Sequence, residues 1–338
     1  MPNIMLTYRC NLHCSYCFAN EFVNKFSTDI TLKNFQVAVE FLTREGSTNV
    51  GLIGGEPTLH PQFEEMMLYL INNSKVDTIT VYTNGLLIQN YLSVLTNPKV
   101  HMLVNCNSPT VIGQKAFTTI QQNLHTLLSK YNMKLRVNVG INLYDINMDY
   151  QYMVELLQKL KFHRVRISVT VPDFSVCGKI DVLDYFRQKK QFLMKFFQDM
   201  DNIQVLPYYD CNKPPFCIWT EDEQDWLKSY VGKYPVKNSN LIGTQSQCFP
   251  VIDILPNLLA VRCFGMSDFL KADIRNFKDI GDLASYFINE IDSNIYKLSS
   301  CSECSNCYER KVRHCATGCM GFKEKEIRLA NEYFANLV

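Results

Sequence analysis

Three cysteines near the N-terminus have the residue type and the spacing to hold a metal group. They lie in the segment Cys10-Asn-Leu-His-Cys14-Ser-Tyr-Cys17, spaced C-x3-C-x2-C, directly after the apolar run 4–8. Thiolates are soft ligands that select iron–sulfur clusters, zinc or Cu(I). Structural zinc normally takes four protein ligands, and no fourth ligand lies nearby in the sequence. A four-iron cluster on three cysteines would keep one iron open, which is the arrangement that a catalyst needs.

Five further cysteines are crowded into a C-terminal stretch. They follow the pattern Cys301-x2-Cys304-x2-Cys307-x7-Cys315-x3-Cys319 in a segment with few apolar residues, so core packing does not explain them. Metal binding is the first interpretation, with a structural zinc knuckle or disulfides as alternatives.

Two more cysteines, Cys248 and Cys263, flank a predicted β-hairpin. The apolar runs 251–255 and 258–262 are separated by Pro256-Asn257, a pattern typical of a hairpin. A two-residue loop would bring the two cysteines to neighbouring positions at the open end of the hairpin.

Composition restricts the class of protein. The chain has 338 residues, enough for one large domain or two ordinary ones, and 47% of them are apolar, which supports a sizeable core. A net charge of +1 gives no general attraction to nucleic acid or to anionic membranes. No apolar run is long enough to span a membrane, and no signal peptide is recognisable. Fourteen cysteines without a secretion signal indicate metal binding in a reducing compartment, so we expect a cytoplasmic protein.

The first 205 residues alternate between strand and helix patterns. Strands are expected at 3–8, 49–53, 76–83, 101–107, 134–142 and 164–171. Helices are expected after Thr31, around 66–71, and at 112–129, 150–160 and 181–199. This alternation predicts an α/β fold with parallel strands.

The expected strands carry polar residues on one face. In 78–84 the polar positions are Thr78, Thr80, Tyr82 and Asn84, and the strands near 138 and 166 alternate in the same way. A parallel strand covered on both faces should be nearly continuously apolar. We therefore expect an incompletely closed barrel around a wet cavity, with a flat sheet solvated on one face as the alternative.

The turn Gly54-Gly55-Glu56-Pro57 ends the second expected strand. Ligands of α/β folds collect at this end of the strands. The two glycines allow a close approach of the backbone, and the backbone groups and the carboxylate suit a bound ammonium group. A simple strand-to-helix turn is the alternative. Thr83-Asn84-Gly85 ends the third strand in the same way.

The cysteine triplet resembles the signature of the radical S-adenosylmethionine (SAM) enzymes, and Tyr16 completes its C-x3-C-x-aromatic-C form. The resemblance implies a partial (β/α)6 barrel of TIM type in which the three cysteines hold a [4Fe–4S] cluster. SAM would chelate the open iron. One electron, from a donor of flavodoxin or ferredoxin type, would cleave SAM to methionine and a 5′-deoxyadenosyl radical that abstracts a substrate hydrogen.

The same resemblance implies a set of SAM contacts. The family's GGEP stretch holds the SAM amino group and matches Gly54, Gly55, Glu56 and Pro57. Tyr16 is expected near the adenine, and Asn105 and Asn107 near the ribose, with Thr83 and Asn84 at the adjacent strand end. Arg166 is expected to pair with the SAM carboxylate, with a salt bridge inside the cavity lining as an equal alternative.

The C-terminal part resembles the SPASM and Twitch extensions, which hold one or two auxiliary [4Fe–4S] clusters. Cys248-x14-Cys263 and the later cysteines match the family order, but Leu258 replaces a glycine, x7 replaces x5, and no cysteine follows Cys319. The resemblance implies one cluster on Cys301, Cys304, Cys307 and Cys315, and another on Cys248, Cys263 and Cys319. The second set lacks a fourth cysteine, so it would have an open iron, another ligand, or help from Cys211 or Cys217. A single auxiliary cluster is the alternative.

We therefore expect three parts: a radical SAM partial barrel at 1–205, a connecting, substrate-side segment at 206–247, and an auxiliary cluster domain at 248–338. Near the substrate side lie Cys177, Cys211 and Cys217, one of which could return a hydrogen atom to a product radical, although burial as packing cysteines is favoured for each.

The resemblance implies an enzyme that modifies a ribosomally made peptide by crosslinking, oxidation or epimerisation. Dehydrogenation of a sugar or another small molecule is the first alternative. Because the chain starts almost at its first strand, recognition of a leader peptide is expected to come from a separate leader-peptide-binding protein or from another surface. A non-catalytic iron–sulfur electron-transfer protein is the alternative from another class, but it leaves 54–57 and the polar strand faces unexplained.

Overall fold

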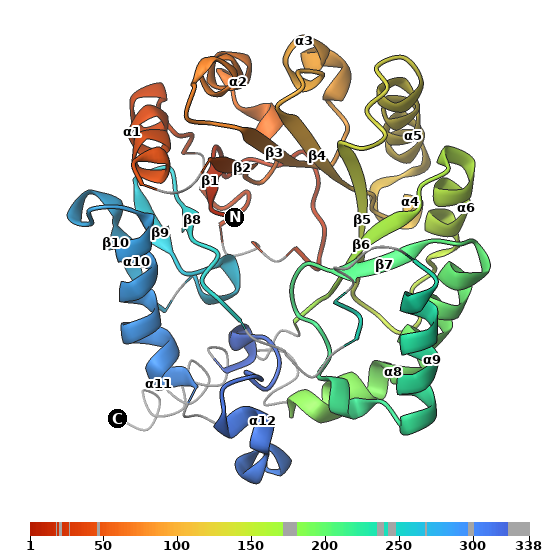
Figure 1. Ribbon diagram of the computed structural model, residues 1–338. Coiled ribbons are helices and arrows are strands. Elements are labelled where there is room, and N and C mark those ends of the chain that lie inside the picture. Colours follow the sequence, from red (N-terminus) through yellow and green to blue (C-terminus); the bar gives the residue numbers. More distant parts are fainter. Residues whose placement is uncertain are drawn as a thin grey trace. The chain divides into compact units, whose positions relative to one another are not determined.

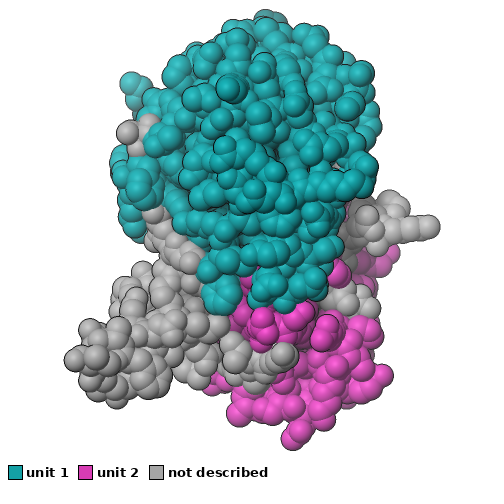
Figure 2. All heavy atoms as spheres, turned by 90° about the vertical axis from the view of Figure 1, so that its left-hand side faces the viewer, with its two compact units in different colours: residues 1–140, 250–290 teal, residues 141–249, 291–338 magenta. Residues whose placement is uncertain are grey.

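The computed structural model describes residues 1–17, 19, 22–26, 28–45, 48–171, 181–234, 240–242, 248–267, 269–296 and 301–323 (Figure 1). The chain forms two compact units, each assembled from two stretches of sequence (Figure 2). Unit 1 comprises residues 1–140 and 250–290, and unit 2 comprises residues 141–249 and 291–338. The division into 1–205, 206–247 and 248–338 stays a prediction.

Unit 1 contains a parallel sheet with a helix after most strands. Its strands are β1 (Asn3–Met5), β2 (Asn49–Ile53), β3 (Thr78–Thr83), β4 (Val100–Asn105) and the start of β5 (Val137–Leu143), each parallel to the next. Its helices are α1 (Leu32–Thr43), α2 (Phe63–Asn72), α3 (Leu92–Leu95), α4 (Pro109–Ile112), α5 (Gln114–Ser129) and α10 (Ile280–Phe287). The predicted parallel α/β arrangement is confirmed.

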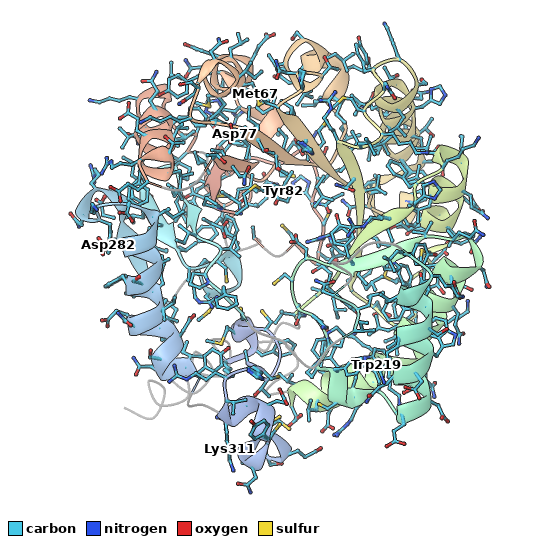
Figure 3. The ribbon with its side chains drawn as sticks, in the orientation of Figure 1. Met67, Asp77, Tyr82, Trp219, Asp282 and Lys311 are labelled. Atoms are coloured by element: carbon cyan, nitrogen blue, oxygen red, sulfur yellow. The ribbon has the colours of Figure 1, made fainter. Side chains whose placement is uncertain are left out.

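Polar and apolar residues alternate on β3 as the sequence predicts. Ile79 and Val81 are buried, whereas Thr80 and Tyr82 are partly exposed. Figure 3 shows Met67 of α2 on one side of β3 and Tyr82 on the other. The helices therefore cover the apolar face, because only that face can bury enough apolar surface to hold them.

A three-stranded antiparallel extension joins the sheet of unit 1 beside β1. The predicted hairpin is confirmed, with shorter strands: β8 (Asp253–Ile254) pairs with β9 (Leu259–Val261), which pairs with β10 (Lys271–Asp273). β8 lies parallel to β1. A buried carboxylate fixes this pairing, since Asp253 accepts hydrogen bonds from Asn3 Nδ2 at 2.7 Å and from the backbone N–H of Phe264 at 3.0 Å.

Leu258 closes the hairpin turn in a conformation that favours glycine. Its φ is +67°, and its N–H donates to the carbonyl of Leu255 at 2.9 Å. A left-handed backbone costs an L-residue about 1–2 kcal/mol. The side chain is only 3% exposed, and burying a leucine contributes about 1.5–3 kcal/mol. Burial thus offsets the strain and explains how this chain tolerates leucine at a position whose backbone conformation favours glycine.

Unit 2 contains a parallel strand pair, β6 (Arg164–Val169) and β7 (Leu206–Tyr209). Its longer helices are α6 (Gln151–Leu160), α8 (Val182–Asn202) and α9 (Glu221–Gly232), and its shorter ones are η3 (Phe216–Ile218), α11 (Ser293–Ile295), η7 (Glu303–Asn306) and α12 (Tyr308–Lys311). A π-helix, η6 (Ile288–Asp292), crosses from unit 1 into unit 2. No helix in the described ranges is long and apolar enough to cross a membrane.

Side-chain caps fix where the main helices begin. The Thr31 hydroxyl accepts from the N–H of Asn34, as expected for the start of α1. Asp181 caps α8, and Thr220 forms a capping box with Glu223 at α9. Such caps satisfy backbone N–H groups that have no partner inside the helix.

Replacing Asp253 by alanine is expected to destabilise the protein by about 2 kcal/mol or more, because two buried donors would lose their acceptor. Asp225→Ala is the matched control, since this exposed residue pairs only with Lys228 along α9 in the described structure. Urea unfolding followed by circular dichroism measures both. Equal effects of the two substitutions would mean that the Asp253 carboxylate does not hold the hairpin.

Candidate functional site

The cysteine loop of unit 1 is tied down on both sides of Cys10. The Arg9 guanidinium pairs with Asp29 at 2.6 Å, and the Thr7 hydroxyl donates to the same carboxylate at 2.5 Å. The N–H of Cys10 donates to Asn24 Oδ1 at 2.8 Å. Asp29 and Asn24 belong to no motif in the sequence, and their only signal there is a position shortly after the cysteines. These contacts fix the position of the backbone that carries the Cys10 thiol.

The Gly54-Gly55 turn packs directly against this loop. The N–H of Gly55 donates to Thr7 O at 2.9 Å, and the N–H of Glu56 donates to Arg9 O at 2.8 Å. A Cβ added at Gly55 would lie 2.3 Å from Arg9 O and 3.0 Å from the Cβ of Cys10. Only glycine fits at this distance. The glycine of this turn therefore sets the position of Cys10.

The Glu56 carboxylate joins the ends of β2 and β3. It is fully buried; Oε1 accepts from the hydroxyls of Thr58 at 2.6 Å and Thr83 at 2.7 Å, and Oε2 accepts from the N–H of Asn84 at 2.7 Å. Burial raises the pKa of Glu56, and these donors oppose that rise. Both oxygens are thus engaged within the protein. A direct contact of Glu56 with SAM stays a prediction, and so does one of the buried Pro57, which begins η1 (Pro57–Leu59).

The ends of β3 and β4 also reach the cysteine loop. Asn84 Nδ2 donates to Asn11 Oδ1 at 2.7 Å. The Tyr16 hydroxyl donates to Asn107 Oδ1 at 3.0 Å, and Asn107 Nδ2 donates to Cys14 Sγ at 3.4 Å. Three adjacent strand ends therefore hold the loop, and the structure brings these predicted site residues together.

An apolar cluster supports the loop from a further side. It contains Met5, Tyr8, Ala19, Phe22, Ile53, Leu255, Val261 and Phe264, with Cys17 and Tyr82 packed against it. The rings of Tyr8 and Phe22 stack at 5.8 Å, and Phe22 meets Phe264 edge to face at 6.1 Å. The β8–β9 hairpin thus contributes to holding the cysteine loop, although it follows that loop by more than 200 residues.

Asn105 and Arg166, two residues predicted to contact SAM, have different surroundings. Asn105, at the end of β4, has a buried Oδ1 with no hydrogen-bond partner among the described residues, so this acceptor is available to a ligand donor. Arg166, in unit 2, donates to Asn142 Oδ1 at 2.9 Å and lies 3.4 Å from Asp210. Contacts of either residue with SAM stay predictions.

The three thiols fit an iron–sulfur cluster better than a single ion. Burial raises the pKa of Cys10 to about 11, with further increases from Glu56 and the other two thiols; burial also raises the pKa of Cys14 and of Cys17. No three His, Cys, Asp or Glu side chains in the described part of the chain converge on one ion. A cubane instead spreads its thiolates over separate irons. The donor set therefore suits a cluster more than tetrahedral zinc.

Several cysteines share a backbone arrangement that favours thiolate. The N–H two residues further on donates to the sulfur at Cys10, Cys17, Cys301, Cys315 and Cys319. Buried Cys106 differs, since its Sγ donates to Val104 O at 3.6 Å. Hydrogen bonds to sulfur stabilise the charged ligand form. These five candidate ligands accept a backbone N–H, whereas Cys106 donates to a carbonyl.

In unit 2 the C-terminal cysteines gather around η7. Cys301 and Cys304 are hydrogen-bonded through their side chains, and burial raises the pKa of Cys304 to about 12. None of the thirteen described cysteines is in a disulfide with another described residue. Cys248 belongs to unit 2 and Cys263 to unit 1, so the cluster that would combine them stays a prediction.

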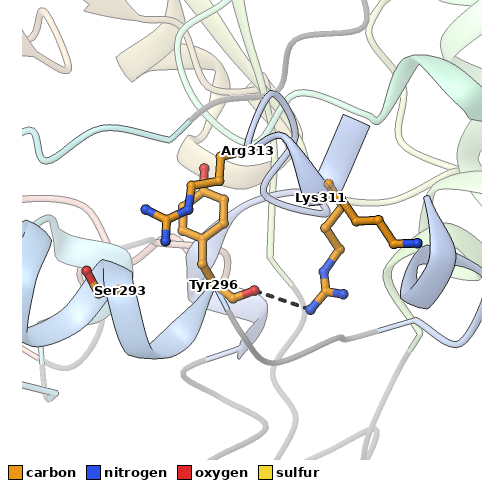
Figure 4. A pocket seen from close by; sticks show the side chains of 5 residues that line it. Ser293, Tyr296, Lys311 and Arg313 are labelled. Carbon is orange, nitrogen blue, oxygen red and sulfur yellow. Dashed lines mark hydrogen bonds between the residues drawn. The ribbon is translucent and has the colours of Figure 1, made fainter. Parts of the chain in front are cut away.

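A basic pocket of about 330 Å³ lies beside these cysteines in unit 2 (Figure 4). Arg310 donates to the carbonyl of Tyr296 at 3.2 Å, and the Lys323 ammonium lies 5.3 Å from the Tyr296 ring centre. Burial and then Arg310 lower the pKa of Lys323 to about 8. The pocket is lined by Ser293, Tyr296, Arg310, Lys311 and Arg313. The loop between Cys307 and Cys315 is therefore strongly basic.

Gly55→Ala is expected to reduce iron bound at the N-terminal cysteines severalfold, because the added Cβ must displace the Arg9–Cys10 backbone. Gly232→Ala is the control, since no atom lies within 4 Å of its added Cβ. Iron and sulfide analysis after oxygen-free reconstitution measures the effect. Full iron binding in Gly55→Ala would show that the turn does not position the cysteine.

Comparison with known proteins agrees with this geometry. Residues 4–117 match the Radical SAM superfamily. Molybdenum cofactor biosynthesis protein 1 of Bos taurus is 26% identical over 144 residues, 40% of this chain and 23% of that protein. GTP 3′,8-cyclase of Chlorobaculum tepidum is 24% identical over 150 residues, 41% of this chain and 45% of that protein. The chain thus spans less than half the length of these two relatives.

Solved structures share the fold over nearly the whole chain. Native anSMEcpe with bound AdoMet has a TM-score of 0.65 at 18% identity and covers 99% of both chains. Streptococcus suis SuiB bound to S-adenosylmethionine has a TM-score of 0.61 at 16% identity, covering 94% of this chain and 72% of SuiB. The predicted partial barrel with a cysteine-bearing C-terminal region is confirmed. Residues 4–117 thus resemble the Radical SAM superfamily, and the shared fold extends over nearly the whole chain.

Proposed function

We propose that this chain is a radical SAM enzyme that abstracts a hydrogen atom from its substrate. The observation that carries the proposal is the cysteine loop held by the ends of β2, β3 and β4. These contacts hold the cysteine loop and the glycine turn at one edge of a parallel sheet, where the Asn105 Oδ1 has no hydrogen-bond partner among the described residues. Ligands of α/β folds bind at this edge.

Each predicted site residue has a role in this proposal. Cys10, Cys14 and Cys17 would hold a [4Fe–4S] cluster that, when bound, supplies the electron for cleavage of SAM to methionine and a 5′-deoxyadenosyl radical. The backbone at 54–57 would receive the SAM ammonium group, and Asn105 and Asn107 would hydrogen-bond the ribose. Tyr16 would lie at the adenine, and Arg166 would pair with the carboxylate.

Thr83 and Asn84 would act through Glu56 and the loop. Thr83 donates to the buried carboxylate, and Asn84 bonds both that carboxylate and Asn11. They would keep the glycine turn and the cysteines in one geometry, which is what transfer of an electron and a hydrogen atom over short distances needs.

The substrate class that we propose is a ribosomally made peptide, modified by crosslinking, oxidation or epimerisation. Support comes from two structures of similar fold that contain peptides: anSMEcpe with Kp18Cys peptide, at a TM-score of 0.63, and SuiB with precursor peptide SuiA, at 0.54. A small-molecule substrate is the second candidate, since curated relatives include proteins named GTP 3′,8-cyclase. Their similarity covers a smaller part of the chain.

The proposed chemistry implies further partners. A flavodoxin or ferredoxin type of donor would supply the electron, and a separate protein would bind the leader of a peptide substrate. One or two auxiliary clusters would occupy the C-terminal cysteines. Thiolate-bound clusters need a reducing setting, so we propose the cytoplasm as the location.

Reduced, iron-loaded protein is expected to convert SAM to 5′-deoxyadenosine, and Cys14→Ala is expected to abolish this, because an incomplete triplet cannot hold the cluster. Cys106→Ala is the matched control, since this cysteine is buried and its thiol donates to a backbone carbonyl. Liquid chromatography with mass spectrometry quantifies the product. Iron-loaded protein that never cleaves SAM, even with a strong reductant, would favour the electron-transfer alternative.

For the substrate class, a short peptide encoded beside the gene is expected to change mass when it is co-expressed with the enzyme. A crosslink or an oxidation removes two hydrogens, and an epimerisation in D2O adds one deuterium. The Cys14→Ala variant should leave the peptide unchanged. Conversion of a sugar or a nucleotide, with no change in any such peptide, would replace the peptide proposal by the small-molecule one.

A further inference from the structure

Two cysteines outside the C-terminal series lie in the loop that follows β7. Cys211 comes two residues after the end of this strand, and Cys217 lies in η3. Both are exposed, so the expectation that they are buried packing cysteines is wrong. Cys177, considered with them, lies outside the described residues.

The backbone around Cys211 is anchored on both sides to β6. On one side Asp210 pairs with Arg166 at 3.4 Å, and its N–H points to the carbonyl of Ile167. On the other side, the buried Asn212 donates from Nδ2 to the carbonyl of Val169. These contacts fix the backbone on both sides of Cys211, and a fixed position is what a metal ligand requires.

Cys319 is fixed as firmly, from a different part of unit 2. The preceding Gly318 has a φ of +81° and packs so closely on α8 that an added Cβ would lie 2.8 Å from Val182 Cγ1. Cys319 is buried, and its sulfur accepts the N–H of Gly321 at 3.4 Å. The side chains of Cys211 and Cys319 are hydrogen-bonded to each other. Two anchored sulfurs from distant parts of the sequence therefore meet.

We propose that Cys211 is a ligand of the auxiliary iron–sulfur cluster that contains Cys319. The proposal rests on the proposed function, and it supplies the cysteine that the C-terminal pattern lacks after Cys319. A [4Fe–4S] cluster without a substrate site takes four cysteines. Four cysteines, Cys301, Cys304, Cys307 and Cys315, already complete the other predicted set, which leaves the set with Cys319 one ligand short.

Cys217 is the competing candidate, and it provides the control. Its thiol interacts electrostatically with Cys304, Cys307 and Cys315, which belong to the other predicted set. Since that set already has four cysteines, Cys217 is surplus to it. Both cysteines are exposed and both lie in the loop after β7, so the two alanine substitutions remove the same group from the same segment.

The test uses the full chain with Cys10, Cys14 and Cys17 all replaced by alanine, so that only auxiliary clusters contribute. After oxygen-free reconstitution, iron per chain and the electron paramagnetic resonance spectrum of the reduced protein are measured. We expect Cys211→Ala to lower bound iron by about half if two auxiliary clusters form, and almost completely if one forms. Cys217→Ala should leave both readouts unchanged.

A second substitution distinguishes loss of the iron ligand from a failure of the variant to fold. In Cys211→Ser the hydroxyl can still ligate iron, so we expect iron to be retained with a changed spectrum, while circular dichroism matches the parent. Unchanged iron and spectrum in both Cys211 variants would overturn the proposal, as would a Cys211–Cys319 disulfide without iron. SAM cleavage by the chain with its N-terminal cysteines intact is assayed separately, so failure of the proposed function is distinguishable.

Discussion

The close packing of the Gly54-Gly55 turn on the Arg9–Cys10 backbone is the constraint on which the site depends. Two backbone hydrogen bonds and a separation that excludes any Cβ connect the end of β2 to the first thiol. In the sequence, the turn and the cysteine triplet are two separate motifs. In the structure they form one assembly, in which the second motif determines where the first can place its sulfur.

The buried Glu56 extends this constraint to the next strand. A fully buried carboxylate is costly unless donors satisfy it, and here Thr58, Thr83 and Asn84 do so. The result is an edge in which hydrogen bonds join the ends of β2 and β3, with Asn107 adding the end of β4. Such positioned side chains suit the proposed chemistry, which needs groups held in a fixed geometry.

In unit 2, hydrogen bonds and close packing likewise hold the C-terminal cysteines. Sulfurs accept backbone N–H groups, and buried or anchored residues flank them. The basic loop between Cys307 and Cys315 adds positive charge near these cysteines in the sequence. Leu258 shows how a departure from a family pattern is accommodated, since burial of its side chain offsets a backbone conformation that favours glycine.

Local patterns determined much of this protein. Thiol spacing, strand alternation and the Thr31 cap depend on residues close together in sequence, so the metal-binding class, the parallel α/β fold and the start of α1 follow from the sequence alone. Tertiary structure decided the rest: the Asn107 contact with Cys14, the burial of Glu56, the position of β8 beside β1, and the meeting of Cys211 with Cys319. These contacts join segments far apart in the chain. No local periodicity records them, because they depend on how separate elements pack in space.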